Sequence, residues 1–450
     1  MGKDAVFEKL VRGLARVAVR IGLPPPADPV RLTGGAMMES WRFRAGEDDY
    51  VLRRAPSAAF IADRPFDHAS ESALIAAVHA DGITAPEVVA VLNDGDNLGS
   101  GFVMRALPGT ADPRAILQMA TPDALLADCA RNLARIHALP ASAVPAGIPV
   151  LDAQEGIAAL RAQFEEAGGD RPIIALGLRW LMDNVPPPVA PVLNHGDFRL
   201  GNILAENGRL TGVLDWELAH WSDHHEDLAF GCMAVWRFAR YDRPALGLGS
   251  LDDWFAAYEA AGGAPVDPAR FRFWTIYRTV WWALGCLRQA QVWREGQDRS
   301  LERVVISRRT SEQELDLLLL LEEEAPEKVR TRRIDSVGFL TPENGEADTA
   351  EMATAVSEWL TTIKHRIDGH DRFQYAIARN ALGIIARADH GLNVLGFDPD
   401  EPPQILAGTL TIRKRHYLDV LRRAALRKCQ IDSPKYPALT VARERWLAKE

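Results

Sequence analysis

The chain has few cysteines, and their spacing suggests neither a metal site nor a disulfide framework. Four cysteines occur in 450 residues, at positions 129, 232, 286 and 429. Cysteines that bind structural zinc usually stand two to four residues apart, and disulfide scaffolds are short and cysteine-dense. We therefore expect a protein of a reducing compartment, the cytoplasm.

Long hydrophobic runs are also absent from the sequence. The longest aliphatic run, Leu317–Leu321, is bordered by acidic residues and is far too short to span a bilayer. Residues 1–23 have the pattern of an amphipathic helix with basic residues, without the apolar core and cleavage site of a secretory signal. We expect no membrane span.

An excess of positive charge is missing as well. Lysine and arginine number 52 against 61 acidic residues, a net charge of −9, which argues against an extended nucleic-acid surface but not against a local basic patch. The chain is 47% hydrophobic and 25% charged, which is typical of a folded globular protein and not of disorder.

The hydrophobic periodicity predicts an α+β protein with two lobes and a helical tail. We expect a small β-rich lobe at 1–109, with a helix at 1–23, a hairpin at 30–54, a helix at 68–81, and strands at 88–92 and 102–106. A larger helical lobe follows at 110–322. Its helices are expected at 122–139, 155–167, 173–185, 226–238, 251–261, 268–295 and 300–322, with a strand-rich stretch at 192–215.

A change of composition separates the tail from the helical lobe. Residues 323–348 are charged and contain prolines and glycines, which predicts a linker. Three amphipathic helices are then expected at 350–368, 371–389 and 403–428, in a small helical domain at 349–450. The last of these helices is basic. We interpret its Arg422 and Arg423 as part of a solvated face, or as a surface that receives an anionic substrate.

The most informative segment is residues 193–204, which read Leu-Asn-His-Gly-Asp-Phe-Arg-Leu-Gly-Asn-Ile-Leu. Asn202 stands five positions after Asp197, the spacing of the protein-kinase catalytic loop. In that chemistry a carboxylate accepts or orients the proton of the attacking hydroxyl, and an amide oxygen nearby binds Mg²⁺. The segment predicts phosphoryl transfer, with Asp197 as the catalytic base.

A predicted hairpin brings a second carboxylate to this loop. Asn207-Gly208 between apolar stretches is a strong type I′ turn signal, so the chain should return and deliver Asp215 close to Asn202. Asn202 and Asp215 would then form a Mg²⁺ site. Asp and Asn in loops more often cap helices or form turns, but this combination of spacing, hairpin and second Asp is far rarer.

The segment resembles the aminoglycoside phosphotransferase and choline kinase family, whose fold is protein-kinase-like. The sequence Leu-Asp-Trp-Glu-Leu-Ala-His at 214–220 and Glu-Asp-Leu-Ala at 226–229 are similar to the branch of kinase-like domains linked to acyl-CoA dehydrogenases. The resemblance covers roughly residues 25–300. It implies an ATP-dependent phosphotransferase with Asp197 as base and Asn202 and Asp215 as Mg²⁺ ligands. Ser222-Asp223-His224 departs from the Gly-Asp-Pro common in that branch, which suggests a changed loop.

The nucleotide is expected to bind in the β-rich lobe. Gly34-Gly35 allows backbone N–H groups to approach phosphates, although a simple turn is the better explanation of the dipeptide taken alone. Arg53, on the following strand, stands where protein kinases have the lysine that holds the α- and β-phosphates. Strand alternation predicts that its neighbour Arg54 faces solvent.

Glu71 is the expected partner of Arg53, because Leu74, Ile75 and Val78 would share its inward helix face. The alternative is a Glu at the edge of the core that reaches water. The strand that includes Met104 and Arg105, and Leu107 after it, resembles the hinge whose backbone holds adenine.

Other candidate residues have structural explanations. His195 is expected to be hydrogen-bonded and structural, Asp227 to order the loop, and the aromatic residues at 274–282 to be mostly core. The His224-His225 pair lacks a credible third metal ligand.

The expected function is ATP- and Mg²⁺-dependent phosphorylation of a small-molecule hydroxyl. A hydroxyacyl-CoA or related metabolite is the first candidate acceptor, by resemblance alone. The alternative is an inactive kinase-like module that binds a ligand and acts through its tail, which the replacement of Lys by Arg53 favours. Oligomeric state is not indicated by the sequence.

Overall fold

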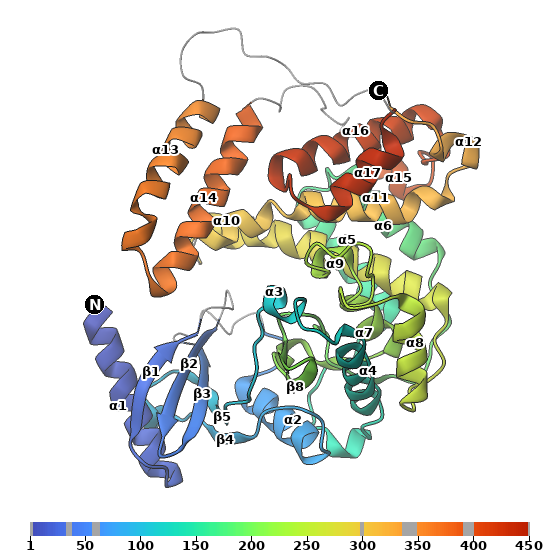
Figure 1. Ribbon diagram of the computed structural model, residues 1–450. Helices are drawn as coiled ribbons and strands as arrows, with labels where there is room; N and C mark the ends of the chain where they lie inside the picture. The colour runs from blue at the N-terminus through green and yellow to red at the C-terminus, as the bar shows by residue number, and fades with distance from the viewer. Residues whose placement is uncertain are drawn as a thin grey trace.

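The computed structural model describes residues 3–32, 38–55, 64–297, 301–334, 349–389 and 400–448. The N-terminal lobe is a five-stranded antiparallel sheet in the order β1-β2-β3-β5-β4 (Figure 1). Its strands are β1 (Pro26–Arg31), β2 (Glu39–Ala45), β3 (Asp48–Ala55), β4 (Val88–Val91) and β5 (Ser100–Arg105). The β2–β3 hairpin turns at Gly46-Glu47, so the predicted strand pair is confirmed.

Two helices cover the two faces of this sheet. Helix α1 (Lys3–Ile21) packs Leu10, Leu14 and Val17 against strand residues that include Tyr50 and Leu52. Helix α2 (His68–Ala80) buries its apolar residues in the main core, together with Phe102 of β5. The sheet is therefore covered on both faces, and side chains of either parity along a strand can be buried.

This double coverage makes one prediction wrong. Arg54 is only 5% exposed, and its guanidinium donates to Glu39 Oε2 (2.8 and 2.9 Å) and to the carbonyl oxygen of Leu98 (3.2 Å). Strand alternation correctly separates Arg54 from Arg53. The face that Arg54 occupies, however, is the one that α1 covers, and no strand pattern reveals a helix packed there.

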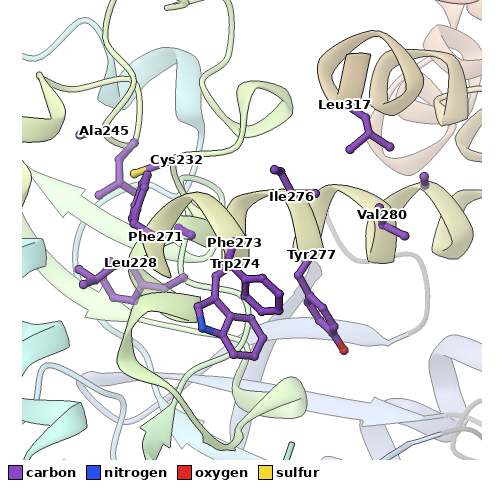
Figure 2. Packing of buried hydrophobic residues seen from close by; sticks show 14 of the residues in the cluster. Leu228, Cys232, Ala245, Phe271, Phe273, Trp274, Ile276, Tyr277, Val280 and Leu317 are labelled. Carbon is purple, nitrogen blue, oxygen red and sulfur yellow. The ribbon is translucent and has the colours of Figure 1, made fainter. Parts of the chain in front are cut away.

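The C-terminal lobe is built around the long helix α9 (Pro268–Arg294). Figure 2 shows Phe273, Trp274 and Tyr277 of α9 among the buried apolar side chains of this lobe. The prediction that the aromatic residues at 274–282 are mostly core is confirmed for Trp274 and Tyr277, whereas Trp281 and Trp282 are half-buried. The other helices of the lobe are α3 (Pro113–Ile116), α4 (Pro122–His137), α5 (Ala153–Glu166), α6 (Pro172–Asp183), α7 (His224–Phe230), α8 (Leu251–Ala260), α10 (Leu301–Ser307) and α11 (Thr310–Leu321).

Three predicted helices prove to be interrupted. The helix expected at 226–238 ends at Phe230, and it is followed by Gly231, where an added side chain would collide with Leu246 and with the carbonyl of Phe198. The helix expected at 300–322 is divided into α10 and α11 by a tight turn at 308–309. The helix expected at 403–428 is two helices, α15 (Glu401–Leu406) and α16 (Arg415–Asp432), since Gly408 adopts a positive φ of 75°.

The tail consists of α13 (Thr349–Ile363), α14 (Gly369–Asp389), α15, α16 and α17 (Pro437–Trp446). Helix α13 packs on α14, and the other four pack directly on the helical lobe. Helix α14 lies beside α10, α15 beside α6, and α16 beside α11 (Figure 1). Between lobe and tail, a 3₁₀ turn (Glu322–Glu324) and α12 (Glu327–Arg330) bury Val329, and Ile334 is buried just beyond them. Residues 335–348 of the predicted linker lie outside the described residues, and the domain boundaries stay a prediction.

The interpretation of the last basic helix as a solvated or substrate-binding face is wrong for Arg422. This side chain is 0% exposed, donates to Glu322 Oε2 (2.9 Å) and to the carbonyl oxygen of Arg330 (2.6 Å), and lies 5.6 Å from the ring centre of Trp446. It joins the tail to the segment that follows α11. Within the described ranges no helix has the length and apolar character needed to cross a membrane.

Candidate active site

The expected catalytic loop leaves the short strand β6 (Val192–Asn194), which pairs with β9 (His220–Ser222). Asp197 follows three residues after the strand, and the amide nitrogen of Asn202 donates to its carboxylate Oδ2 (2.5 Å) and its carbonyl oxygen (3.0 Å). The five-residue spacing therefore brings the two side chains into contact. With its nitrogen turned toward Asp197, the amide of Asn202 keeps its oxygen for another partner.

A buried carboxylate holds the start of this loop. Asp227 of α7 accepts hydrogen bonds from the backbone N–H groups of His195 (2.5 Å) and Gly196 (2.8 Å), and it is 1% exposed. It also lies 3.4 Å from Nε2 of His137. Because Asp227 accepts hydrogen bonds from two backbone amides of the loop, it holds the loop in place, as the sequence suggested.

His195 occupies a structural position beneath the loop. Its Nε2 lies 2.9 Å from the carbonyl oxygen of Leu214, and its Nδ1 lies 3.2 Å from the backbone nitrogen of Asp197, which donates to it. A carbonyl only accepts and an amide N–H only donates, so the neutral ring with its proton on Nε2 satisfies both contacts. Burial lowers the pKa of His195, which agrees with the neutral form.

The hairpin delivers the second carboxylate as expected. Strands β7 (Ile203–Glu206) and β8 (Arg209–Val213) pair in antiparallel fashion, and Asn207 and Gly208 both have positive φ, 53° and 72°, as a type I′ turn requires. Beyond β8, the N–H of Leu214 donates to the carbonyl oxygen of Asn202 (2.7 Å). Asp215 then adopts a left-handed conformation (φ 68°), an uncommon geometry that turns its side chain at the end of the hairpin.

Asp215 meets the cation of the N-terminal lobe. The guanidinium of Arg53 contacts Oδ1 of Asp215, donates to Glu217 Oε2 (3.1 Å), and lies 3.7 Å from Oε1 of Glu71. Glu71 is 0% exposed on the inward face of α2, so the expected pair of Arg53 and Glu71 is present. The ion pairs join the two lobes across the site.

Arg64 is a member of this cluster that the sequence did not reveal. It donates to Glu71 Oε2 (2.5 Å) and to Glu217 Oε2 (2.9 Å). Two guanidinium groups therefore face three carboxylates, with Asp215 as the third. Burial, and then the charge of Asp215, raise the pKa of Glu217 to about 7. The burial of Glu71 on an apolar helix face was the signal in the sequence that could have prompted a search for a cation besides Arg53.

Arg199 is the second residue that sequence reasoning missed. Its Nε donates to Oδ1 of Asp197 (2.7 Å), and its guanidinium lies 4.2 Å from the ring centre of Trp236. Burial raises the pKa of Asp197 and the charge of Asp215 adds to this effect, while Arg199 opposes it. A cation two positions after the expected base was the available signal in the sequence.

The expected adenine hinge lies on the edge of the same lobe. Met104 pairs with Val51 and Val88, and the backbone N–H of Arg105 donates to the carbonyl oxygen of Glu87 (2.8 Å). In the described ranges, the N–H of Leu107 has no acceptor and is available to a ligand. Gly34 and Gly35 lie outside the described residues.

The expectation that His224 and His225 lack a third candidate metal ligand is wrong, because the carboxylate of Asp223 lies beside them. Asp223, His224 and His225 bring three candidate ligand atoms within 4.8 Å of one another. Their polar atoms already have protein partners: Asp223 accepts from Arg270 (2.7 and 2.9 Å), and Nε2 of His225 accepts from the N–H of Asp267 (2.9 Å). These contacts explain the cluster as a structural one.

Solved structures with the same fold are phosphotransferases. A putative aminoglycoside phosphotransferase from Ralstonia eutropha matches with a TM-score of 0.56 and 19% identity, covering 69% of this chain and 98% of that chain. A thermostable mutant of aminoglycoside phosphotransferase APH(4)-Ia, in a ternary complex with AMP-PNP and hygromycin B, matches with a TM-score of 0.50 and 17% identity, covering 69% and 97%. At these identities the likeness establishes the kinase-like α+β fold that the sequence predicts.

Curated relatives share part of their length with this chain. Acyl-CoA dehydrogenase family member 10 of Mus musculus is 26% identical over 266 residues, 53% of this chain and 24% of that protein. Probable acyl-CoA dehydrogenase IBR3 of Arabidopsis thaliana is 26% identical over 115 residues, 22% of this chain and 14% of that protein. The chain spans about a quarter or less of these relatives. The phosphotransferase enzyme family matches residues 29–274, more than half of the chain, and the chain belongs to that family.

Proposed function

We propose that this phosphotransferase transfers the γ-phosphate of ATP to a hydroxyl group of a small molecule, with Asp197 as the catalytic base. The observation that carries the proposal is the contact between Asp197 and Asn202 beside the hairpin that ends at Asp215. A base must lie next to the metal-binding groups, because the attacking hydroxyl and the metal-bound phosphate have to meet in line.

The donor set fits a magnesium ion. Asn202 offers an amide oxygen and Asp215 a carboxylate, the hard oxygen ligands that Mg²⁺ prefers together with phosphate oxygens. Three carboxylates against two guanidinium groups leave the cluster around Asp215 with an excess of negative charge, which favours a bound cation. When bound, Mg²⁺ would neutralise charge on the transferred phosphoryl group.

Each remaining residue has a task that follows from its contacts. Arg53, oriented by Glu71, would hold the α- and β-phosphates, and the hinge at Met104, Arg105 and Leu107 would hold adenine. The raised pKa of Asp197 improves it as a proton acceptor, since a base works best with a pKa nearer the working pH. Arg199 would steady this carboxylate and add positive charge beside the transferred group.

The acceptor is proposed to be a hydroxyacyl-CoA or a related acyl metabolite. Support for this class comes from the likeness to acyl-CoA dehydrogenase family member 10, which covers 53% of the chain. The test is ATP consumption with Mg²⁺ across hydroxyacyl-CoAs, amino alcohols, sugars and aminoglycosides. We expect turnover with one class, and a loss of about 10²–10⁴-fold in kcat for Asp197→Asn. Asp252→Asn, at an exposed position of α8, is the matched control.

A second candidate is a non-catalytic ligand-binding module. The observation in its favour is that Arg53 already contacts three carboxylates, an arrangement that could lock the site. Equal ATP consumption by wild type and Asp197→Asn, with every acceptor, would favour this candidate over the enzyme.

A further inference from the structure

A cavity of about 600 Å³ lies where the tail helices meet the helical lobe. On the side of the lobe its wall includes Ala234, Val235 and Phe238, and on the side of the tail it includes one face of α14 and the turn at 432–437 between α16 and α17. This volume lies within the range of about 300–1,000 Å³ typical of small-molecule sites. Both the lobe and the tail contribute to the cavity wall, and α14 of the tail packs beside α10 of the lobe (Figure 1).

The carboxylates of the cavity wall are already neutralised. Glu312 accepts from Arg309 Nε (3.0 Å) and from the hydroxyl of Ser433 (2.6 Å). Asp432 forms an ion pair with Arg308 at 2.5 Å. Neither carboxylate therefore needs the other cations that line the cavity.

Three of those cations are less well matched by carboxylates of the described residues, and only the longer-range charge of Asp432 acts on Arg387. Arg379 Nε donates to Ser357 Oγ (3.3 Å), Arg387 Nε donates to the carbonyl oxygen of Ile431 (2.5 Å), and Lys435 is exposed at the rim. In the part of the chain that the structure describes, none of the three forms an ion pair. Half-buried guanidinium groups are costly to leave without an anion. The cavity thus has the charge of an anion site.

A short chain of contacts joins this cavity to Asp197. Val235 lines the cavity, and the ring of the next residue, Trp236, lies close to two guanidinium groups. Arg309, on the cavity side, is 5.8 Å from the ring centre of Trp236, and Arg199 is 4.2 Å from it. Arg199 in turn binds Asp197 at 2.7 Å. Arg309 of the cavity wall is therefore linked to the expected base through Trp236 and Arg199, which do not themselves line the cavity.

We propose that this cavity binds the anionic end, phosphate or carboxylate, of the molecule whose hydroxyl is phosphorylated at Asp197. The inference rests on the proposed function and narrows its acceptor class. Arginine forks bind phosphate and carboxylate in a bidentate manner, which suits Arg379 and Arg387 to this role. The same cations disfavour amino alcohols and aminoglycosides, whose ammonium groups they would repel.

Calorimetric titration of the full chain tests the proposal, with Mg²⁺ and AMP-PNP saturating the nucleotide site. The probes are coenzyme A, which carries phosphates, and 3-hydroxybutyrate, which carries only a carboxylate. We expect wild type to bind at least one of them, and the probe that binds more tightly identifies the group that the cavity takes. Arg379→Gln and Arg387→Gln should each weaken that probe about tenfold, and the exposed Lys435→Gln about threefold.

The matched control is Arg372→Gln, an exposed arginine of the same helix that does not line the cavity, and its Kd should stay at the wild-type value. Wild type that binds neither probe, or equal Kd values for wild type, Arg379→Gln and Lys435→Gln, would overturn the proposal. The proposed function can fail separately. If Arg379→Gln loses probe binding but wild type phosphorylates no acceptor, the anion site stands and the kinase activity is refuted. Asp197→Asn should lower kcat by about 10²–10⁴-fold and retain probe binding.

Discussion

Replacing Asp227 by Asn should both destabilise the protein and slow catalysis. The carboxylate receives two loop amides, those of His195 and Gly196, on its two oxygens. An asparagine of the same shape has one oxygen and one NH₂ group. One of the two backbone N–H groups would then face a donor, and the loop before Asp197 would lose half of its anchorage.

The magnitude follows from the two bonds. A hydrogen bond to a charged group contributes about 1.5–3 kcal/mol, and a buried donor without an acceptor costs about 1–3 kcal/mol. Asp227→Asn keeps one bond, loses the other and leaves one donor unsatisfied, so the free energy of unfolding should fall by about 3–5 kcal/mol. kcat should also fall, because a small misplacement of Asp197 impairs in-line attack.

Urea denaturation at several pH values is the assay, with Asp252→Asn as control. Burial raises the pKa of Asp227, but the hydrogen bond and charge of His137 outweigh burial and hold it below the ordinary value of 3.8. The stabilisation by this carboxylate is therefore complete above that value and is lost as pH falls through the folded pKa. The difference in the free energy of unfolding between wild type and Asp227→Asn should therefore become smaller at acidic pH. Equal free energies of unfolding for the two at pH 7 would refute the reasoning.

Three more predictions test other contacts. Arg53→Ala should raise the KM for ATP at least about tenfold, whereas Arg53→Lys should retain most of the affinity; equal KM values in steady-state assays would contradict a phosphate role. Arg199→Ala removes the cation that lowers the pKa of Asp197, so the acidic limb of the pH–kcat profile should move to higher pH, and an unmoved limb would count against the contact. Burial raises the pKa of Asp316 to about 8, so its contribution to stability should decline as pH rises from about 4 to 8, and Asp316→Asn should remove that slope in thermal melts.

Local patterns predicted the catalytic loop well. The spacing from Asp197 to Asn202 and the Asn207-Gly208 turn depend on neighbours only a few residues apart. Backbone preferences and short loops decide such geometry, and they can be seen in the sequence. The pairing of Glu71 with Arg53 was also predictable, because a carboxylate on an apolar helix face needs a cation.

Contacts between distant segments were much harder to predict. Arg54 and Arg422 look like surface arginines by local pattern, yet α1 and the segment after α11 bury them. Arg64 joins the ion-pair cluster through Glu217, which is 153 positions away in the chain. Burial of a charged residue is decided by what packs on top of it, and a single helix or strand carries no record of that neighbour.

The sequence by itself determined the family, the fold class and the residues of the expected catalytic loop, since these follow from short-range spacing and hydrophobic periodicity. Only the tertiary structure decided how the tail packs. Of the helices that the sequence assigned to a separate small domain, the last ones share a core with the helical lobe, while α14 lines a basic cavity beside Trp236. Such a cavity arises where surfaces from five parts of the chain meet, and its charge depends on which of the lining residues form ion pairs with one another.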